Sequence, residues 1–195
     1  HTEFTRSISA TLPKQDPTPA ALPQLGAVDG PERREAPAPQ PFEMALVAAA
    51  RSGRTNDVRR LLDEGCRVDD EGDGGEGSPL WYACAGGHLQ SAKLLLLRGA
   101  AVDRECSGRT PLVVACQNGR ADVASLLIER GAAIATPTTT GLSALNTAAR
   151  GGHADIVALL LTRFSRGAET AFAREAAAIH GHADVVELLD AFAMG

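Results

Sequence analysis

The feature that most constrains this chain is a motif that recurs about every 33 residues. Four tripeptides that end in leucine start at Met44, Ser78, Thr110 and Ser143, with spacings of 34, 32 and 33 residues. A glycine follows nine residues after each start, and a leucine-rich segment follows each glycine. A period of this length indicates repeats that cannot bury their apolar faces alone and must stack on their neighbours.

The pattern within each repeat predicts two short antiparallel helices followed by a finger-like loop. Ser78-Pro79 and Thr110-Pro111 suit a helix start, because the hydroxyl caps free amides and proline needs no donor at the next position. Small pairs such as Ala83-Cys84 allow neighbouring first helices to approach closely. The leucines of the second helix then fill the space between layers.

This pattern resembles the ankyrin repeat, whose units open with Thr-Pro-Leu-His, turn at Gly-His and close with a Gly-Ala-Asp-like sequence. The inter-helix turn matches at Gly87-His88, Gly152-His153 and Gly181-His182, and it departs at Gly53-Arg54 and Gly119-Arg120. The opening histidine is replaced by Val47, Trp81, Val113 and Asn146. The resemblance implies an all-α solenoid of about five helix pairs that binds another protein through a concave groove and its finger loops.

The chain is predicted to have two parts. Residues 1–41 hold eight of the eleven prolines and keep no helical or strand period, which predicts a disordered or extended tail. The repeats then occupy approximately 42–75, 76–107, 108–140, 141–168 and 169–195. The last unit has no finger before it, so we expect a lengthened second helix through Thr162–Ala168. An atypical terminal pair is expected at Thr170–His180 and Ala183–Phe192.

Composition excludes several classes of function. The net charge of -5 and pI near 5.5 disfavour nucleic acid as a partner. The longest apolar run, Met44–Ala50, has seven residues and is too short to span a membrane. The four cysteines lack disulfide or zinc spacing, and no secretory signal is visible, so we expect a cytoplasmic or nuclear monomer. No catalytic or phosphate-binding motif occurs, so we expect that the chain is not an enzyme and binds no cofactor.

Trp81 and Tyr82, the only tryptophan and tyrosine, are candidate partner contacts, because aromatic side chains are favoured binding anchors. The alternative for Trp81 is that its ring fills the slot of the missing motif histidine. The resemblance also implies a set of polar contacts on the fingers or in the groove, namely Arg109, Gln117, Asn118, Asn146 and Arg150.

The loop Asp69–Glu76 carries five acids and no base. It is interpreted either as a solvated finger tip or as a contact for a partner with a basic surface, through Asp70, Glu71, Asp73 and Glu76. Its start also matches a calcium loop, but Leu80 stands where a bidentate glutamate is needed, so we expect no metal there.

Together these patterns predict a protein–protein interaction module that acts as an adaptor or scaffold. Two alternatives remain open at this point. One is an inhibitor or regulatory subunit of an enzyme or transcription factor. The other is a regulatory fragment of a larger enzyme or channel.

Overall fold

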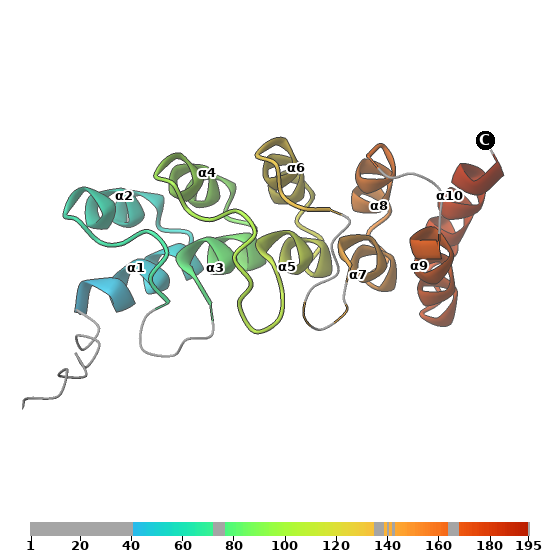
Figure 1. Cartoon of the computed structure of the whole chain (residues 1–195), viewed down its shortest axis with the longest axis horizontal. Helices are drawn as coiled ribbons and strands as arrows, with labels where there is room; N and C mark the ends of the chain where they lie inside the picture. The colour runs from blue at the N-terminus through green and yellow to red at the C-terminus, as the bar shows by residue number, and fades with distance from the viewer. Residues whose placement is uncertain are drawn as a thin grey trace, which may run out of the picture. The chain divides into compact units, whose positions relative to one another are not determined.

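In the computed structural model of the chain, the described residues are 41–71, 77–134, 139, 141, 143–163 and 168–194. These residues form ten α-helices (Figure 1): α1 Pro41–Arg51, α2 Thr55–Asp63, α3 Pro79–Gly86, α4 Leu89–Leu97, α5 Pro111–Gln117, α6 Ala121–Glu129, α7 Ala144–Arg150, α8 Ala154–Leu161, α9 Ala168–Ile179 and α10 Ala183–Met194. The tail predicted for residues 1–41 falls outside the described residues, except for Pro41.

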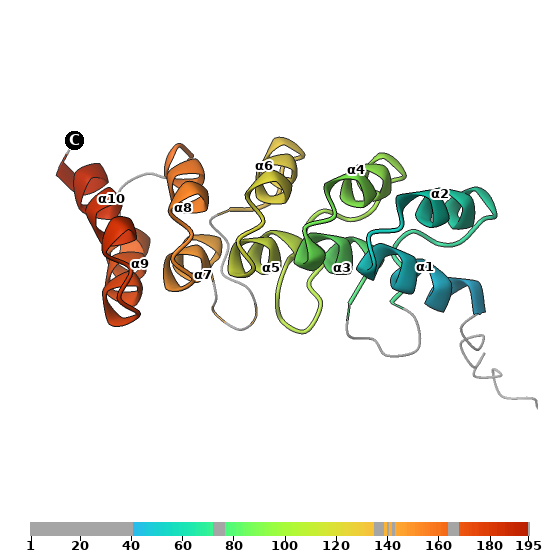
Figure 2. The same ribbon diagram turned by 180° about the vertical axis from the view of Figure 1, so that it is seen from behind.

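Within residues 41–194 the helices form two rows, which Figures 1 and 2 show from opposite sides. The first helices of the pairs, α1, α3, α5, α7 and α9, contact one another in that order. The second helices α2, α4, α6 and α8 form the other row, and α10 packs against both α8 and α9. The predicted all-α solenoid of five helix pairs is therefore confirmed.

Hydroxyl caps begin the three middle first helices, as the sequence predicts. The side-chain oxygens of Ser78, Thr110 and Ser143 accept a hydrogen bond from a backbone N–H three residues later, at 3.2, 3.3 and 3.2 Å. Each capping residue has an extended backbone that breaks the helix on its N-terminal side. The caps therefore fix where the first helix of each repeat begins.

The first helix begins earlier than the repeat pattern predicts. Met44 was aligned with the capping hydroxyls, but it lies inside α1, which starts at Pro41. The tail prediction also included Pro41, which instead opens this helix. Proline is tolerated in the first turn of a helix, because its missing N–H would have no helical partner there.

The core lies between the two rows and repeats with the sequence. The leucines of the four starting tripeptides are completely buried: Leu46, Leu80, Leu112 and Leu145. The small residues Cys84 and Cys116 are also completely buried. Burial raises the pKa of the Cys116 thiol to about 12 and raises that of Cys84 as well.

The prediction of a lengthened second helix through Thr162–Ala168 is wrong. Helix α8 ends at Leu161, and Thr162 and Arg163 form an exposed turn. The last two positions of this helix, Leu160 and Leu161, are buried, so the helix ends where the chain becomes exposed at Thr162. The terminal pair is confirmed, although α9 starts two residues earlier than predicted, at Ala168, and α10 continues to Met194.

Candidate functional site

A ladder of side chains joins the turns of successive repeats and holds the first helices in register. The Nε2 atoms of His88, His153 and His182 lie 3.0, 3.3 and 3.1 Å from the carbonyl oxygens of Arg51, Gln117 and Arg150 in the preceding repeat. Arg120 occupies the same turn position and donates from Nε to the Ala85 oxygen at 3.4 Å. The turn histidines therefore have a structural role, and they anchor the backbone of Gln117 and Arg150.

The fingers are joined by a second ladder, made of acidic side chains. The carboxylate of Asp69 accepts a hydrogen bond from the Ala101 N–H at 3.2 Å, and that of Asp103 accepts one from the Ala133 N–H at 3.0 Å. Glu71 accepts from Arg104 at 2.9 and 3.0 Å. Each of these bonds links one finger to the next, so these acids set the register of the fingers.

A tight hairpin at the tip of the second finger positions Arg109. Cys106 and Arg109 exchange two backbone hydrogen bonds of 3.0 and 3.1 Å. The two residues between them, Ser107 and Gly108, both have positive φ, at 51° and 69°. Two-residue hairpins favour this conformation. The chain thus turns back sharply and brings Arg109 directly before the cap of α5.

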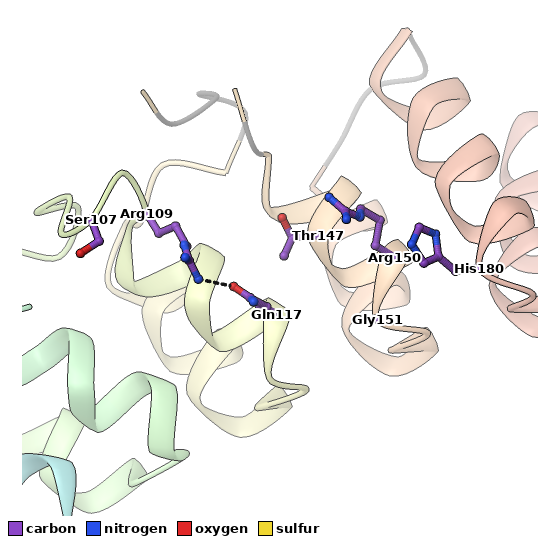
Figure 3. A pocket seen from close by; sticks show the side chains of 7 residues that line it. All are labelled: Ser107, Arg109, Gln117, Thr147, Arg150, Gly151 and His180. Carbon is purple, nitrogen blue, oxygen red and sulfur yellow. Dashed lines mark hydrogen bonds between the residues drawn. The ribbon is translucent and has the colours of Figure 1, made fainter. Parts of the chain in front are cut away.

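Arg109 faces a groove with a volume of about 460 Å³ that extends over three repeats (Figure 3). Its guanidinium donates from Nη1 to the Gln117 Oε1 at 2.8 Å, spanning α5 from its start to its last residue. The groove is lined by Ser107, Arg109, Gln117, Thr147, Arg150, Gly151 and His180. We call this surface the Arg109–Arg150 groove.

Three of the predicted contacts, Arg109, Gln117 and Arg150, line this groove together. The sequence predictions missed Ser107, Thr147, Gly151 and His180. Thr147 stands at the same repeat position as Tyr82, four residues after the capping residue, so the repeat register contained a signal for it. His180 comes from the terminal pair, whose irregular spacing gave no such signal.

Trp81 and Tyr82 lie at the start of α3 and are not among the residues that line the groove. The Trp81 ring is half-buried against the core, and no described residue accepts a hydrogen bond from its buried Nε1. The Tyr82 ring meets the Trp81 ring edge-on, with centroids 5.1 Å apart. The Arg51 guanidinium lies 5.4 Å from the Tyr82 centroid, a cation–π distance. Both aromatic rings therefore have packing partners within the chain.

The two predicted asparagines lie at the end of α5 and in the first turn of α7. Asn118 is the C-cap of α5, and its Nδ2 donates to the Ala85 carbonyl oxygen at 3.0 Å, across to the preceding repeat. Asn146 is half-buried in the first turn of α7, where its backbone N–H donates to the Ser143 cap. Neither is among the residues that line the groove.

The acidic loop is only partly described. The carboxylate of Asp70 lies 3.8 Å from Arg67, and that of Glu71 is paired with Arg104, so both acids have a basic neighbour within the chain. Asp73 and Glu76 lie outside the described residues. Asp69 is the first position of the calcium-like pattern, and its carboxylate accepts a hydrogen bond from the Ala101 N–H.

The described residues also bear on metal binding and on membrane insertion. No group of three or more His, Cys, Asp and Glu side chains among them is placed to hold a metal ion. None of the helices described above is both long and apolar enough to cross a membrane.

Comparison with known proteins gives one family. A family model described as ankyrin repeats in three copies matches residues 46–138. No curated protein matches the chain. The matched range covers most of the first three helix pairs and ends before α7.

Proposed function

Because this chain belongs to the ankyrin-repeat family, we propose that it is an adaptor or scaffold that binds a partner protein through its groove and finger loops. Ankyrin repeats are generally protein–protein interaction modules without catalytic activity. The observation that carries the proposal is the groove itself. It brings Arg109 from a finger together with Gln117 and Arg150 from two neighbouring first helices.

The way the groove is built supports a binding role. Its side chains stand on helices whose backbones are tied to the next repeat by His153 and His182. Arg109 is fixed by the hairpin and by its bond to Gln117. Side chains held on a rigid scaffold lose little conformational entropy when a partner binds, so more of the contact energy appears as affinity.

An affinity capture with matched variants tests the proposal. The wild-type chain, a Gln117→Ala/Arg150→Ala variant and a Lys93→Ala/Arg130→Ala control are immobilised and exposed to extract of the source cells. Lys93 and Arg130 are exposed residues of α4 and at the end of α6, in the other row of helices. We expect one partner to be retained by the wild type and the control and lost by the groove variant. Equal retention by all three chains would place the contact elsewhere.

The acidic loop Asp69–Glu76 is a second contact in this proposal, and it would suit a partner with a basic surface. Asp70 and Glu71 already have arginine neighbours, so a basic partner would compete with Arg67 and Arg104. An Asp73→Asn/Glu76→Gln variant in the same capture isolates the remaining acids. Loss of the partner with this variant, and not with the groove variant, would favour the loop.

The same groove would also serve an inhibitor or regulatory subunit of an enzyme or transcription factor. If the captured partner is an enzyme, its turnover is measured with and without the purified chain. A fall in turnover that the groove variant does not reproduce would favour inhibition over an adaptor role. Recovery of a longer reading frame that contains these repeats would favour a regulatory fragment of a larger enzyme or channel.

We further propose a cytoplasmic or nuclear location and a monomeric state. Two of the four cysteines, Cys84 and Cys116, fill buried core positions where other repeats have alanine, such as Ala149. The net charge of -5 supports a protein partner rather than a nucleic acid. Sedimentation of the purified chain over a range of concentrations tests the monomer.

A further inference from the structure

The two charged side chains that line the Arg109–Arg150 groove, Arg109 and Arg150, are both basic. Arg109 and Arg150 lie on its wall, and His180 stands at its far side (Figure 3). No acidic side chain is among the described residues that line it. The chain as a whole carries a net charge of -5, so this groove is locally opposite in sign to the molecule.

Three acidic side chains of the fingers are engaged in bonds between neighbouring fingers. The Asp103 carboxylate accepts the Ala133 N–H, and Glu105 accepts from the backbone N–H and the hydroxyl of Thr139, the latter at 2.8 Å. Glu71 is paired with Arg104. These carboxylates hold neighbouring fingers together, so turning one of them toward the groove would break an inter-finger bond.

The two groove arginines lack an acidic partner within the described residues. Arg109 bonds to the neutral amide oxygen of Gln117. No hydrogen bond or ion pair joins the Arg150 side chain to another described residue, and this side chain is exposed. A carboxylate forms stronger, charge-assisted and often bidentate bonds with a guanidinium than an amide oxygen does. An incoming carboxylate can therefore displace Gln117 from Arg109 and pair with Arg150.

We propose that the Arg109–Arg150 groove binds a short acidic segment of a partner protein, whose glutamate or aspartate carboxylates pair with these two guanidinium groups. This inference rests on the proposed protein-binding function and specifies the chemistry of the partner. Gln117 and Arg109 can then donate hydrogen bonds together to the bound segment. Opposite charge also accelerates the encounter and makes the affinity depend on salt.

The test uses the full chain and a phage-displayed library of random dodecapeptides as the probe. Three proteins are compared: the wild type, the Arg109→Gln/Arg150→Gln groove variant and a Lys93→Gln/Arg130→Gln control that removes the same charge from the other row of helices. We expect the wild type and the control to enrich peptides with an excess of Asp and Glu. The groove variant should not enrich them, and unchanged circular dichroism shows that it is folded.

A double-mutant cycle on the most enriched peptide then tests direct contact. Replacing its glutamate by glutamine, or Arg150 by glutamine, should each weaken binding by between about tenfold and a hundredfold. The double change should cost much less than the product of the two, since both remove the same pair. Raising the salt concentration should weaken the wild-type complex more than the doubly changed one, which keeps only the pairing at Arg109.

Other results overturn the inference. Two results of the peptide selection would show a different occupant. One is enrichment of peptides without an excess of acidic residues. The other is equal retention of the peptides by the wild type and the Arg109→Gln/Arg150→Gln variant. A dimer of the wild type that the groove variant cannot form would show that a second copy is the occupant. If no peptide is enriched but the capture experiment yields a groove-dependent partner, the acidic segment is wrong and the protein-binding function stands. Failure of both experiments removes both proposals.

Discussion

The glycine in the turn between the two helices of a repeat has two separate requirements. Gly119 has a φ of +66°, which disfavours any residue with a Cβ, and a Cβ at this place would lie 2.6 Å from the ring of His153. Gly131, at the end of the same repeat, has a φ of +86° and no atom within 4 Å of such a Cβ. The two glycines therefore share the backbone requirement, and only Gly119 has the steric one.

Gly119→Ala should consequently destabilise the chain more than Gly131→Ala. The left-handed backbone alone costs about 1–2 kcal/mol for a residue with a Cβ, which is the loss expected for Gly131→Ala. Gly119→Ala adds displacement of His153 and of its bond to the Gln117 oxygen. Urea unfolding followed by circular dichroism measures both. Equal losses of stability for the two variants would mean that His153 and its hydrogen bond shift to make room for the new methyl group without cost.

The buried thiols predict how stability changes with pH. Burial raises the pKa of Cys116 to about 12 from a usual value of 9.0, and it raises that of Cys84 too. A raised pKa in the folded state stabilises the fold fully below pH 9. Above pH 9 the unfolded thiols ionise and the buried ones do not, so this stabilisation is lost as the pH rises from 9 toward 12.

The free energy of unfolding should therefore fall above pH 9 by up to about 1.4 kcal/mol per pH unit for each buried thiol. A Cys84→Ala/Cys116→Ala variant removes this contribution and leaves the other groups that titrate in this range unchanged. Alanine fits, because Ala149 fills the same repeat position. Urea titrations at pH 8, 9 and 10 should give a steeper decline for the wild type, and parallel declines would contradict the assignment.

At the scale of single elements, the helix caps were predictable because a capping hydroxyl depends on residues close in sequence. Ser143 precedes α7, and its oxygen accepts the Asn146 N–H at 3.2 Å. Ser125 has the same hydroxyl but lies within α6, where its oxygen is 3.5 Å from the Glu129 carboxylate. The position in the helix, and not the type of side chain, decides what the hydroxyl contributes.

Ser143→Ala should destabilise the chain by about 1 kcal/mol, because the partly buried Asn146 N–H at the helix start loses its partner. Ser125→Ala should be neutral or slightly stabilising, since alanine is the better helix former in a helix interior. Thermal unfolding of the two variants is the measurement. A loss at Ser125 as large as that at Ser143 would show that the cap is not the cause.

The errors in the predicted elements arise where the structure depends on contacts between residues that are distant in sequence. The helix expected to continue beyond Leu161 ends there, and it packs against α6 and α10, which are distant in sequence and leave no local pattern. The start of α1 at Pro41 was not predicted, because the proline-rich composition before it indicated a tail. In the groove, Arg109, Gln117 and Arg150 were implied by the resemblance to the ankyrin repeat. Ser107 and His180 were not, because their places depend on how a finger and the irregular last pair lie across the stack.

At the scale of the whole stack of helix pairs, within the described part of residues 41–194, each helix pair makes its main contacts with its neighbours. Stability is then close to a sum of repeat terms and interface terms, and the effect of a change depends on where it lies. Leu127 in α6 and Leu189 in α10 are a matched pair, because both are buried leucines of second helices, 0% and 2% exposed. Leu127 lies in the middle repeat, with neighbours on both sides, whereas Leu189 lies in the last pair.

Leucine-to-alanine changes at buried sites cost about 2–5 kcal/mol. At Leu189 this loss should raise hydrogen exchange mainly in α9 and α10, because the last pair can open without exposing the interfaces among the other repeats. At Leu127 it weakens the repeat that joins the two halves, so exchange should rise from α3 to α8. Hydrogen exchange followed by mass spectrometry resolves these segments. A uniform rise for both variants would mean that the whole stack unfolds as one unit, and additive repeat energetics would then not describe it.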